Sequence, residues 1–180
     1  SPDGTYLAFS SSRQGNAEVY KLNTKTKQLE RLTNHRAGDL SPSWSPTGRE
    51  MAFTSDRGGG PQVYLMGADG SNLRRLTFAG DYNASPAWSP RGTWIAHVCR
   101  TKKNYYKICL TTPDGRKRRQ ITKGRGVDDS PAWSPDGRHL VFSSLSGGKS
   151  HIYMVNADGT DLERLTVAGS HYSAPAWSPI

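Results

Sequence analysis

Short apolar segments recur along the chain at nearly constant spacing, with turn residues between them. An aliphatic residue, a small or aliphatic residue and a ring follow one another at 7–9, 51–53, 95–97 and 140–142. Runs of this length, bounded by Gly, Pro and Asp-Gly, are typical of β-strands, and no segment has the 3.6-residue periodicity of a helix. The pattern therefore predicts an all-β protein.

A tryptophan motif recurs between these strands. Its fullest copy, residues 130–137, reads Ser-Pro-Ala-Trp-Ser-Pro-Asp-Gly, and its second proline and its glycine favour a tight turn after the tryptophan. The tryptophans of the four copies are 44, 45 and 44 residues apart: Trp44, Trp88, Trp133 and Trp177. A strand-rich repeat of this length is the signature of a β-propeller blade, and we expect these tryptophans to fill the space between blades.

We predict one domain over residues 1–180, a β-propeller of four-stranded antiparallel blades with four repeats of about 44 residues. The repeats cover residues 1–44, 45–88, 89–133 and 134–177. A single four-stranded sheet cannot bury both of its faces, whereas sheets stacked around an axis can. A terminal strand at 173–177 would close the ring onto the first repeat. The alternatives are a part of a larger ring and a piece that assembles with copies of itself.

Positive charge is concentrated in the third repeat. The net charge is +9, and this repeat holds eleven Lys and Arg against three Asp. Its basic run 116–119, with Lys102, Lys103 and Lys107, has a composition that attracts nucleic acid or anionic lipid. No aromatic residues interleave with the run, so we favour protection of an exposed edge strand and expect no nucleic-acid partner. No apolar run is long enough to span a membrane, and no signal peptide is recognisable.

The two cysteines, Cys99 and Cys109, lie on opposite arms of a predicted hairpin in the third repeat. A cross-strand disulfide is one arrangement that an oxidising compartment would permit. We favour two free, buried thiols, because cysteine often packs as a small hydrophobic residue.

The repeat resembles those of the TolB-type β-propeller family, which are WD40-like repeats also called PD40. The matching motifs are Trp133–Gly137, Leu140–Phe142, Ile152–Met154, Asp158-Gly159 and Leu165-Thr166. The resemblance implies a periplasmic scaffold of the Tol–Pal envelope system, whose propeller binds the lipoprotein Pal. Similar repeats also occur in the propellers of prolyl-oligopeptidase-like enzymes and of some carbohydrate lyases.

Catalytic motifs are missing from the sequence. It contains no Gly-x-Ser-x-Gly elbow, no His-Glu-x-x-His, no paired Cys-x-x-Cys and no phosphate-binding loop. His97 stands where the other repeats have phenylalanine, so we expect a packed imidazole and not a metal ligand. We therefore favour a non-enzymatic, protein-binding scaffold without a cofactor. The alternatives are a gate or scaffold of a hydrolase or lyase and a purely structural repeat array.

The candidate site lies in the loops that lead into each Pro-x-Trp strand, which a propeller places at the mouth of its central channel. The predicted partner-binding rim comprises His35, Arg36, Asp39, Asp81, Tyr82, Asn83, Arg125, Asp128, Asp129, His171 and Tyr172. Loops that differ at equivalent places and carry Tyr and Arg suit a protein-binding surface. Asp39, Asn83 and Asp128 align with one another, and a ring of their oxygens could hold a channel cation. We favour the simpler interpretation, in which they cap the turn into the strand.

Overall fold

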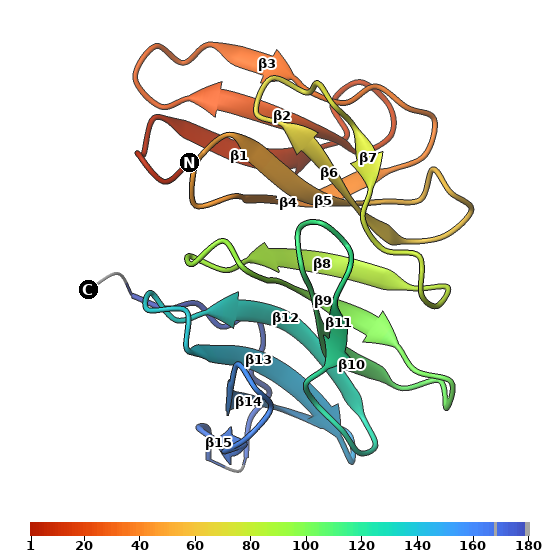
Figure 1. Ribbon diagram of the computed structural model, residues 1–180. Helices are drawn as coiled ribbons and strands as arrows, with labels where there is room; N and C mark the ends of the chain where they lie inside the picture. The colour runs from red at the N-terminus through yellow and green to blue at the C-terminus, as the bar shows by residue number, and fades with distance from the viewer. Residues whose placement is uncertain (168, 179–180) are drawn as a thin grey trace.

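The computed structural model describes residues 1–167 and 169–178, and every regular element in these ranges is a β-strand (Figure 1). This confirms the predicted all-β class. Within the described ranges there is accordingly no helix with the length and apolar character needed to cross a membrane.

Two of the three sheets come from the first half of the chain. One has three antiparallel strands, β1 (Tyr6–Ser11), β2 (Glu18–Asn23) and β3 (Leu29–Arg31). The other has four antiparallel strands, β4 (Asp39–Trp44), β5 (Glu50–Ser55), β6 (Gln62–Gly67) and β7 (Arg74–Arg75). In both sheets each strand pairs with the next one along the chain, as short connecting turns favour.

The second half of the chain repeats this arrangement twice. One antiparallel meander contains β8 (Asn83–Trp88), β9 (Ile95–Arg100), β10 (Tyr106–Thr111) and β11 (Arg118–Gln120). The next contains β12 (Val127–Trp133), β13 (His139–Ser146), β14 (Lys149–Asn156) and β15 (Glu163–Arg164). A single parallel bridge between Tyr106 and Val127 joins the two meanders into an eight-stranded sheet.

The sheets follow one another in chain order through the molecule, from β1–β3 at the top of Figure 1 to β13–β15 at the bottom. They do not close into a ring. Among the described residues β1 pairs only with β2, and residues 173–177 form no strand. The predicted closure by a strand at 173–177 is therefore not seen in this structure.

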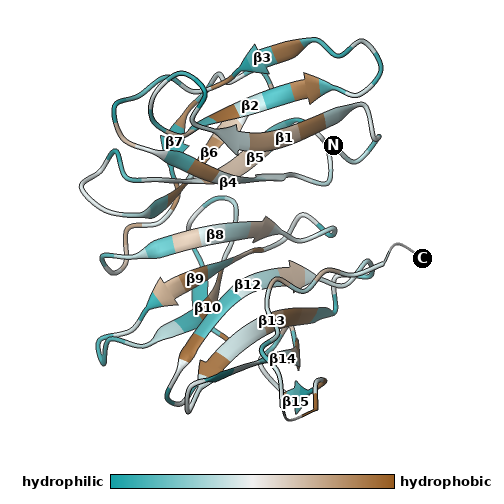
Figure 2. Cartoon of the chain, turned by 180° about the vertical axis from the view of Figure 1, so that it is seen from behind, coloured by the Kyte–Doolittle hydropathy of each residue, from teal (hydrophilic) through white to brown (hydrophobic). Residues whose placement is uncertain are grey.

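The apolar core lies between successive sheets. Trp88 and Ile95 pack against Val63 and Leu65 of the preceding sheet. Trp133 is part of an equivalent cluster with residues of β9, β10 and β13. Its indole Nε1 donates to the carbonyl of Ala87 at 2.9 Å, which ties one first strand to the next. In Figure 2 most of the hydrophobic colour lies on the strands, which also carry hydrophilic segments, whereas most of the loops are pale or hydrophilic.

A threonine follows the last strand of each meander and hydrogen-bonds to the strand before it. Thr33, Thr77, Thr122 and Thr166 each accept a hydrogen bond, at 2.9–3.1 Å, from the backbone N–H of the residue just before the ladder to the last strand begins. Because a buried N–H without a partner is costly, these hydroxyls stabilise strand positions that this ladder leaves unpaired. The recurring Leu-Thr or Ile-Thr pair in the sequence therefore has a structural cause.

The first strand of each four-stranded meander carries a β-bulge at its Ser-Pro dipeptide. The pairing register shifts there in β4, β8 and β12, and Ser41, Ser85 and Ser130 have φ between 53° and 54°. Non-glycine residues rarely adopt this left-handed conformation, and bulges are places where a strand is re-aimed. The dipeptides line one cavity of about 270 Å³, together with Ala174-Pro175. The four segments therefore converge on a common centre.

Cys99 and Cys109 form a disulfide between β9 and β10, with their Cα atoms 5.8 Å apart. The expectation of two free thiols is wrong. In the β9–β10 register Cys99 lies opposite Lys107 and Cys109 opposite His97, so the cysteines are diagonal neighbours on one face of the hairpin. Diagonal neighbours lie close enough for a bridge, which spacing along the sequence does not reveal.

Candidate functional site

The aligned polar residues at the entry of each first strand meet a partner 21 positions earlier in the chain. Asn83 Nδ2 donates to Gln62 Oε1 at 3.0 Å, and Lys107 Nζ donates to Asp128 Oδ2 at 3.1 Å. Tyr172 stacks on His151 with the ring centroids 6.1 Å apart. Each of these entry loops thus contacts the strand that lies before it in the chain.

The first such pair consists of two acids, Glu18 and Asp39, and both side chains are fully buried. Burial tends to raise the pKa of Glu18, but hydrogen bonds from Thr33, the His35 N–H and Arg31 outweigh it and lower the pKa. Burial raises the pKa of Asp39, against the opposing effect of Arg57, whose guanidinium lies 2.6 Å from the carboxylate. Arg31 and Arg57 therefore compensate the negative charges of Glu18 and Asp39.

Asp39, Asn83 and Asp128 are buried at the strand entries and face protein partners. The described part of the chain has no cluster of three acidic, His or Cys side chains placed to hold a metal ion. Each of the three residues therefore hydrogen-bonds or ion-pairs with a side chain of the protein, namely Arg57, Gln62 or Lys107.

The other rim residues are accessible. Arg36, Asp81, Arg125, Asp129 and His171 are exposed, whereas His35, Tyr82 and Tyr172 are partly buried. They lie on four segments that each lead within a few residues to one of the dipeptides lining the cavity of about 270 Å³. The structure therefore separates the predicted rim into buried anchors and an exposed, variable set, which we call the exposed rim.

Three rim residues contact their neighbours. The ring of Tyr82 packs edge-on against Tyr106 with centroids 4.9 Å apart, and burial raises the pKa of Tyr82. Asp81 forms a two-pronged ion pair with Arg100. Asp129 accepts a hydrogen bond from the N–H of Ser130 at the bulge. These contacts hold part of the exposed rim in place.

His97 is fully buried, and its Nε2 lies 2.9 Å from the Thr111 hydroxyl. Burial lowers the pKa of His97 to about 4, so the ring is neutral at physiological pH. The imidazole is packed in the interior, as the sequence predicted.

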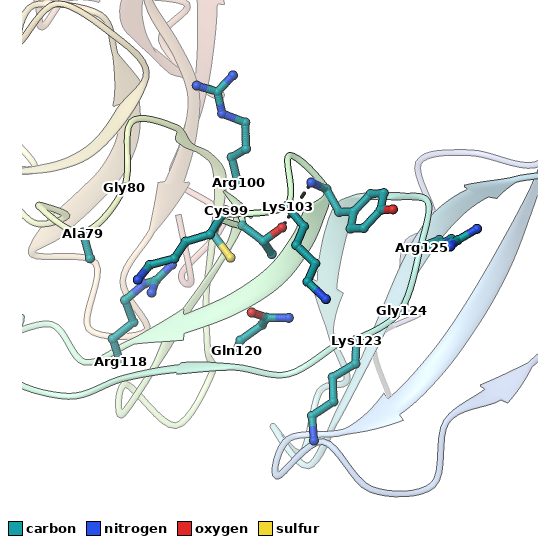
Figure 3. A pocket seen from close by; sticks show the side chains of 13 residues that line it. Ala79, Gly80, Cys99, Arg100, Lys103, Arg118, Gln120, Lys123, Gly124 and Arg125 are labelled. Atoms are coloured by element: carbon teal, nitrogen blue, oxygen red, sulfur yellow. Dashed lines mark hydrogen bonds between the residues drawn. The ribbon is translucent and has the colours of Figure 1, made fainter.

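A basic cavity beside the disulfide was missed by the sequence reasoning. It has a volume of about 780 Å³ and lies between the Ala79-Gly80 loop, the β9–β10 hairpin, strand β11 and residues 123–125 (Figure 3). Six of its lining residues are cationic: Arg100, Lys102, Lys103, Arg118, Lys123 and Arg125. The excess charge of the third repeat was the only signal of this cavity in the sequence.

The sequence analysis assigned Lys107 and the run 116–119 to one positively charged region. In the structure these residues lie in different environments. Lys107 is buried against Asp128, so it is not part of a basic surface. Arg119 stacks on Trp94 at 4.7 Å and donates to the Ala157 carbonyl at 2.6 Å. Only Arg118 of the run faces the cavity, while residues 116 and 117 lie in the exposed turn that precedes β11.

Repeated antiparallel meanders, tryptophans between sheets and first strands that converge on a centre define a β-propeller repeat protein. A family model described as the TolB beta propeller domain matches residues 1–180, and the chain belongs to this family. A comparison with curated proteins finds no match.

Solved structures agree with this assignment. TolB from Acinetobacter baumannii has a TM-score of 0.88 and 32% identity over 100% of this chain and 45% of its own. A structure described as a TolB of Agrobacterium tumefaciens has a TM-score of 0.83 and 26% identity over 91% of this chain and 62% of its own. Hydrazine synthase of Kuenenia stuttgartiensis, with a TM-score of 0.70 and 19% identity over 88% of this chain and 31% of its own, shares the fold alone. The chain thus spans less than two thirds of the TolB structures that it matches.

Proposed function

We propose that the chain is a non-enzymatic TolB-like scaffold that binds a protein partner through the exposed rim. The observation that carries the proposal is the split of the predicted rim into buried anchors and accessible, variable residues. Buried anchors fix the loops, and exposed Arg, His and Asp side chains beside partly buried Tyr rings offer the mixed chemistry typical of interfaces.

The partner that we propose is a Pal-like envelope lipoprotein, and the compartment is the periplasm. Membership of the TolB propeller family and the 32% identity to a TolB structure support both proposals. A disulfide across β9 and β10 is consistent with an oxidising compartment.

We also propose that the four repeats at 1–44, 45–88, 89–133 and 134–177 are blades of a ring. Leu7 is 54% exposed, whereas its equivalents Met51 and Ile95 are fully buried. Leu165 is 48% exposed, whereas its equivalent Leu76 is 3% exposed. Two apolar faces left open in this way favour a ring completed by further repeats or by a second copy of the chain.

Calorimetric titration with a Pal-like partner tests the proposed surface. We expect Tyr82→Ala with Tyr172→Ala to weaken binding by at least about tenfold, because aromatic anchors carry much of the energy of an interface. Since both rings are partly buried, the more exposed pair Arg36→Ala with His171→Ala provides a second test that spares the packing.

Arg116→Gln with Lys117→Gln is the control, since both residues lie in an exposed turn away from the rim. We expect this variant to keep its affinity for the partner to within about twofold at physiological salt. If it loses binding while the rim variants keep it, the wrong surface has been chosen.

A further inference from the structure

The third repeat departs from the others in one concentrated region. In three repeats a phenylalanine of one strand packs on a tyrosine of the next, as in Phe9–Tyr20, Phe53–Tyr64 and Phe142–Tyr153. The third repeat has His97 and Cys109 at these positions. Two large rings are replaced by an imidazole and half of a disulfide, and the other half of that disulfide, Cys99, lines the basic cavity.

The third repeat also differs from the other repeats in the charge of this region. Arg118 stands where the other repeats have leucine, at Leu29, Leu73 and Leu162. Its guanidinium donates to the Cys109 sulfur at 3.3 Å, a weak acceptor, and partial loss of water lowers the pKa of Arg118. An arginine that lies against a disulfide without a carboxylate partner is well placed to receive an anion.

Most cations around the cavity are uncompensated. Arg100 points away from Lys123 in Figure 3 and is paired with Asp81. Lys102, Lys103, Arg118, Lys123 and Arg125 form no ion pair with any residue that the structure describes. None of the described residues that line the cavity is Asp or Glu. Five unpaired positive charges around one hollow create a strong local potential for anions.

A disulfide and a hydrogen bond fix the walls of the cavity near its cationic residues. The disulfide ties the two strands of the hairpin, and Lys107 Nζ lies 3.4 Å from the Arg125 carbonyl that it hydrogen-bonds. Figure 3 shows Lys103, Gln120 and Lys123 on different segments around the same hollow. A volume of about 780 Å³ lies within the range of small-molecule sites.

We propose that this cavity is a binding site for a ligand with several phosphate groups, either a free polyphosphate or a phosphorylated headgroup. Arginine and lysine together suit phosphate oxygens, since Arg donates in a planar fork and Lys as a point charge. A concave site suits a compact anion better than an extended acidic peptide. The site goes beyond the proposed partner surface, with which it shares Arg125 alone.

Calorimetric titration of the whole chain with sodium tripolyphosphate is the first test. We expect one site per chain and an affinity at least about tenfold weaker in Arg118→Gln with Lys123→Gln. Arg116→Gln with Lys117→Gln removes the same charge outside the cavity and should change the affinity by less than about twofold. Equal weakening by both pairs would show general attraction to the basic chain and overturn the proposal.

Vesicle sedimentation distinguishes the two sources of phosphate. Binding to vesicles with phosphatidylinositol bisphosphate, lost in Arg118→Gln with Lys123→Gln, would assign the site to a headgroup. Tripolyphosphate binding without vesicle binding would assign it to a free ligand. If neither probe binds while an octaglutamate peptide binds in a way that depends on Arg118 and Lys123, the cavity is a peptide site and the proposal is wrong. The partner titration above uses no variant of these two residues, so each proposal can fail alone.

Discussion

The buried ion pair between Lys107 and Asp128 can be exchanged for the neutral pair that the preceding repeat uses. The two side chains are 2% and 4% exposed, with Nζ 3.1 Å from Oδ2. Gln62 and Asn83 occupy the equivalent positions and hydrogen-bond at 3.0 Å. The preceding repeat therefore shows which neutral pair can replace both charges.

Removing one charge should be costly. Lys107→Gln leaves the buried Asp128 carboxylate with Ser144 as its side-chain donor, and breaking a buried pair in this way costs about 3–5 kcal/mol. Asp128→Asn leaves the buried Lys107 ammonium without its carboxylate partner and should lower the free energy of unfolding by a similar amount. Lys107→Gln with Asp128→Asn restores a neutral hydrogen bond, and we expect it to lie within about 1 kcal/mol of the parent protein.

Urea unfolding followed by circular dichroism measures all three variants and gives the free energy of unfolding by linear extrapolation. The expected double-mutant coupling is at least about 3 kcal/mol in favour of the double variant. Additive losses in the double variant, or a loss below about 1 kcal/mol in Lys107→Gln, would refute the reasoning.

Three further predictions concern stability. Burial lowers the pKa of His97 to about 4 from 6.5, so the unfolded chain takes up the proton first. The free energy of unfolding should therefore fall by about 3 kcal/mol as the pH drops through that window. His97→Phe should remove this dependence, and a variant that keeps the pH profile of the parent protein would contradict the prediction. Thiol titration of the unfolded, non-reduced protein should find no free thiol, and Cys99→Ala with Cys109→Ala should lower the free energy of unfolding by about 2–3 kcal/mol; two titratable thiols would exclude the disulfide. Trp133→Ala should cost about 3–5 kcal/mol and Trp177→Ala clearly less, because Trp133 is 9% exposed and Trp177 only partly buried; equal losses in urea unfolding would argue against the packing between sheets.

The strand order was predictable because it depends on local chemistry that recurs. Proline and glycine after each tryptophan set the turns, and the alternation of side chains sets the strands. The Leu-Thr pairs were visible as a pattern, but the role of Thr33 or Thr77 as an acceptor for a strand-start N–H required the fold.

The details of the site depended on tertiary pairing. Asp128 and Lys107 belong to different sequence motifs, and only the packing of one loop on the preceding strand brings them together. The disulfide follows from a diagonal register that spacing does not specify. The basic cavity gathers cationic residues of the β9–β10 hairpin, of position 118 and of residues 123–125, and these become one feature only when the strands are paired.

Hydrogen exchange with and without a Pal-like partner tests the central claim, that this propeller binds through its exposed rim. Amides in residues 34–40, 78–84, 123–129 and 169–173 should exchange more slowly in the complex, because binding removes these loops from solvent and suppresses their local opening. Protection confined to the outer strands β3, β7, β11 and β15, with the four loops unchanged, would contradict the account.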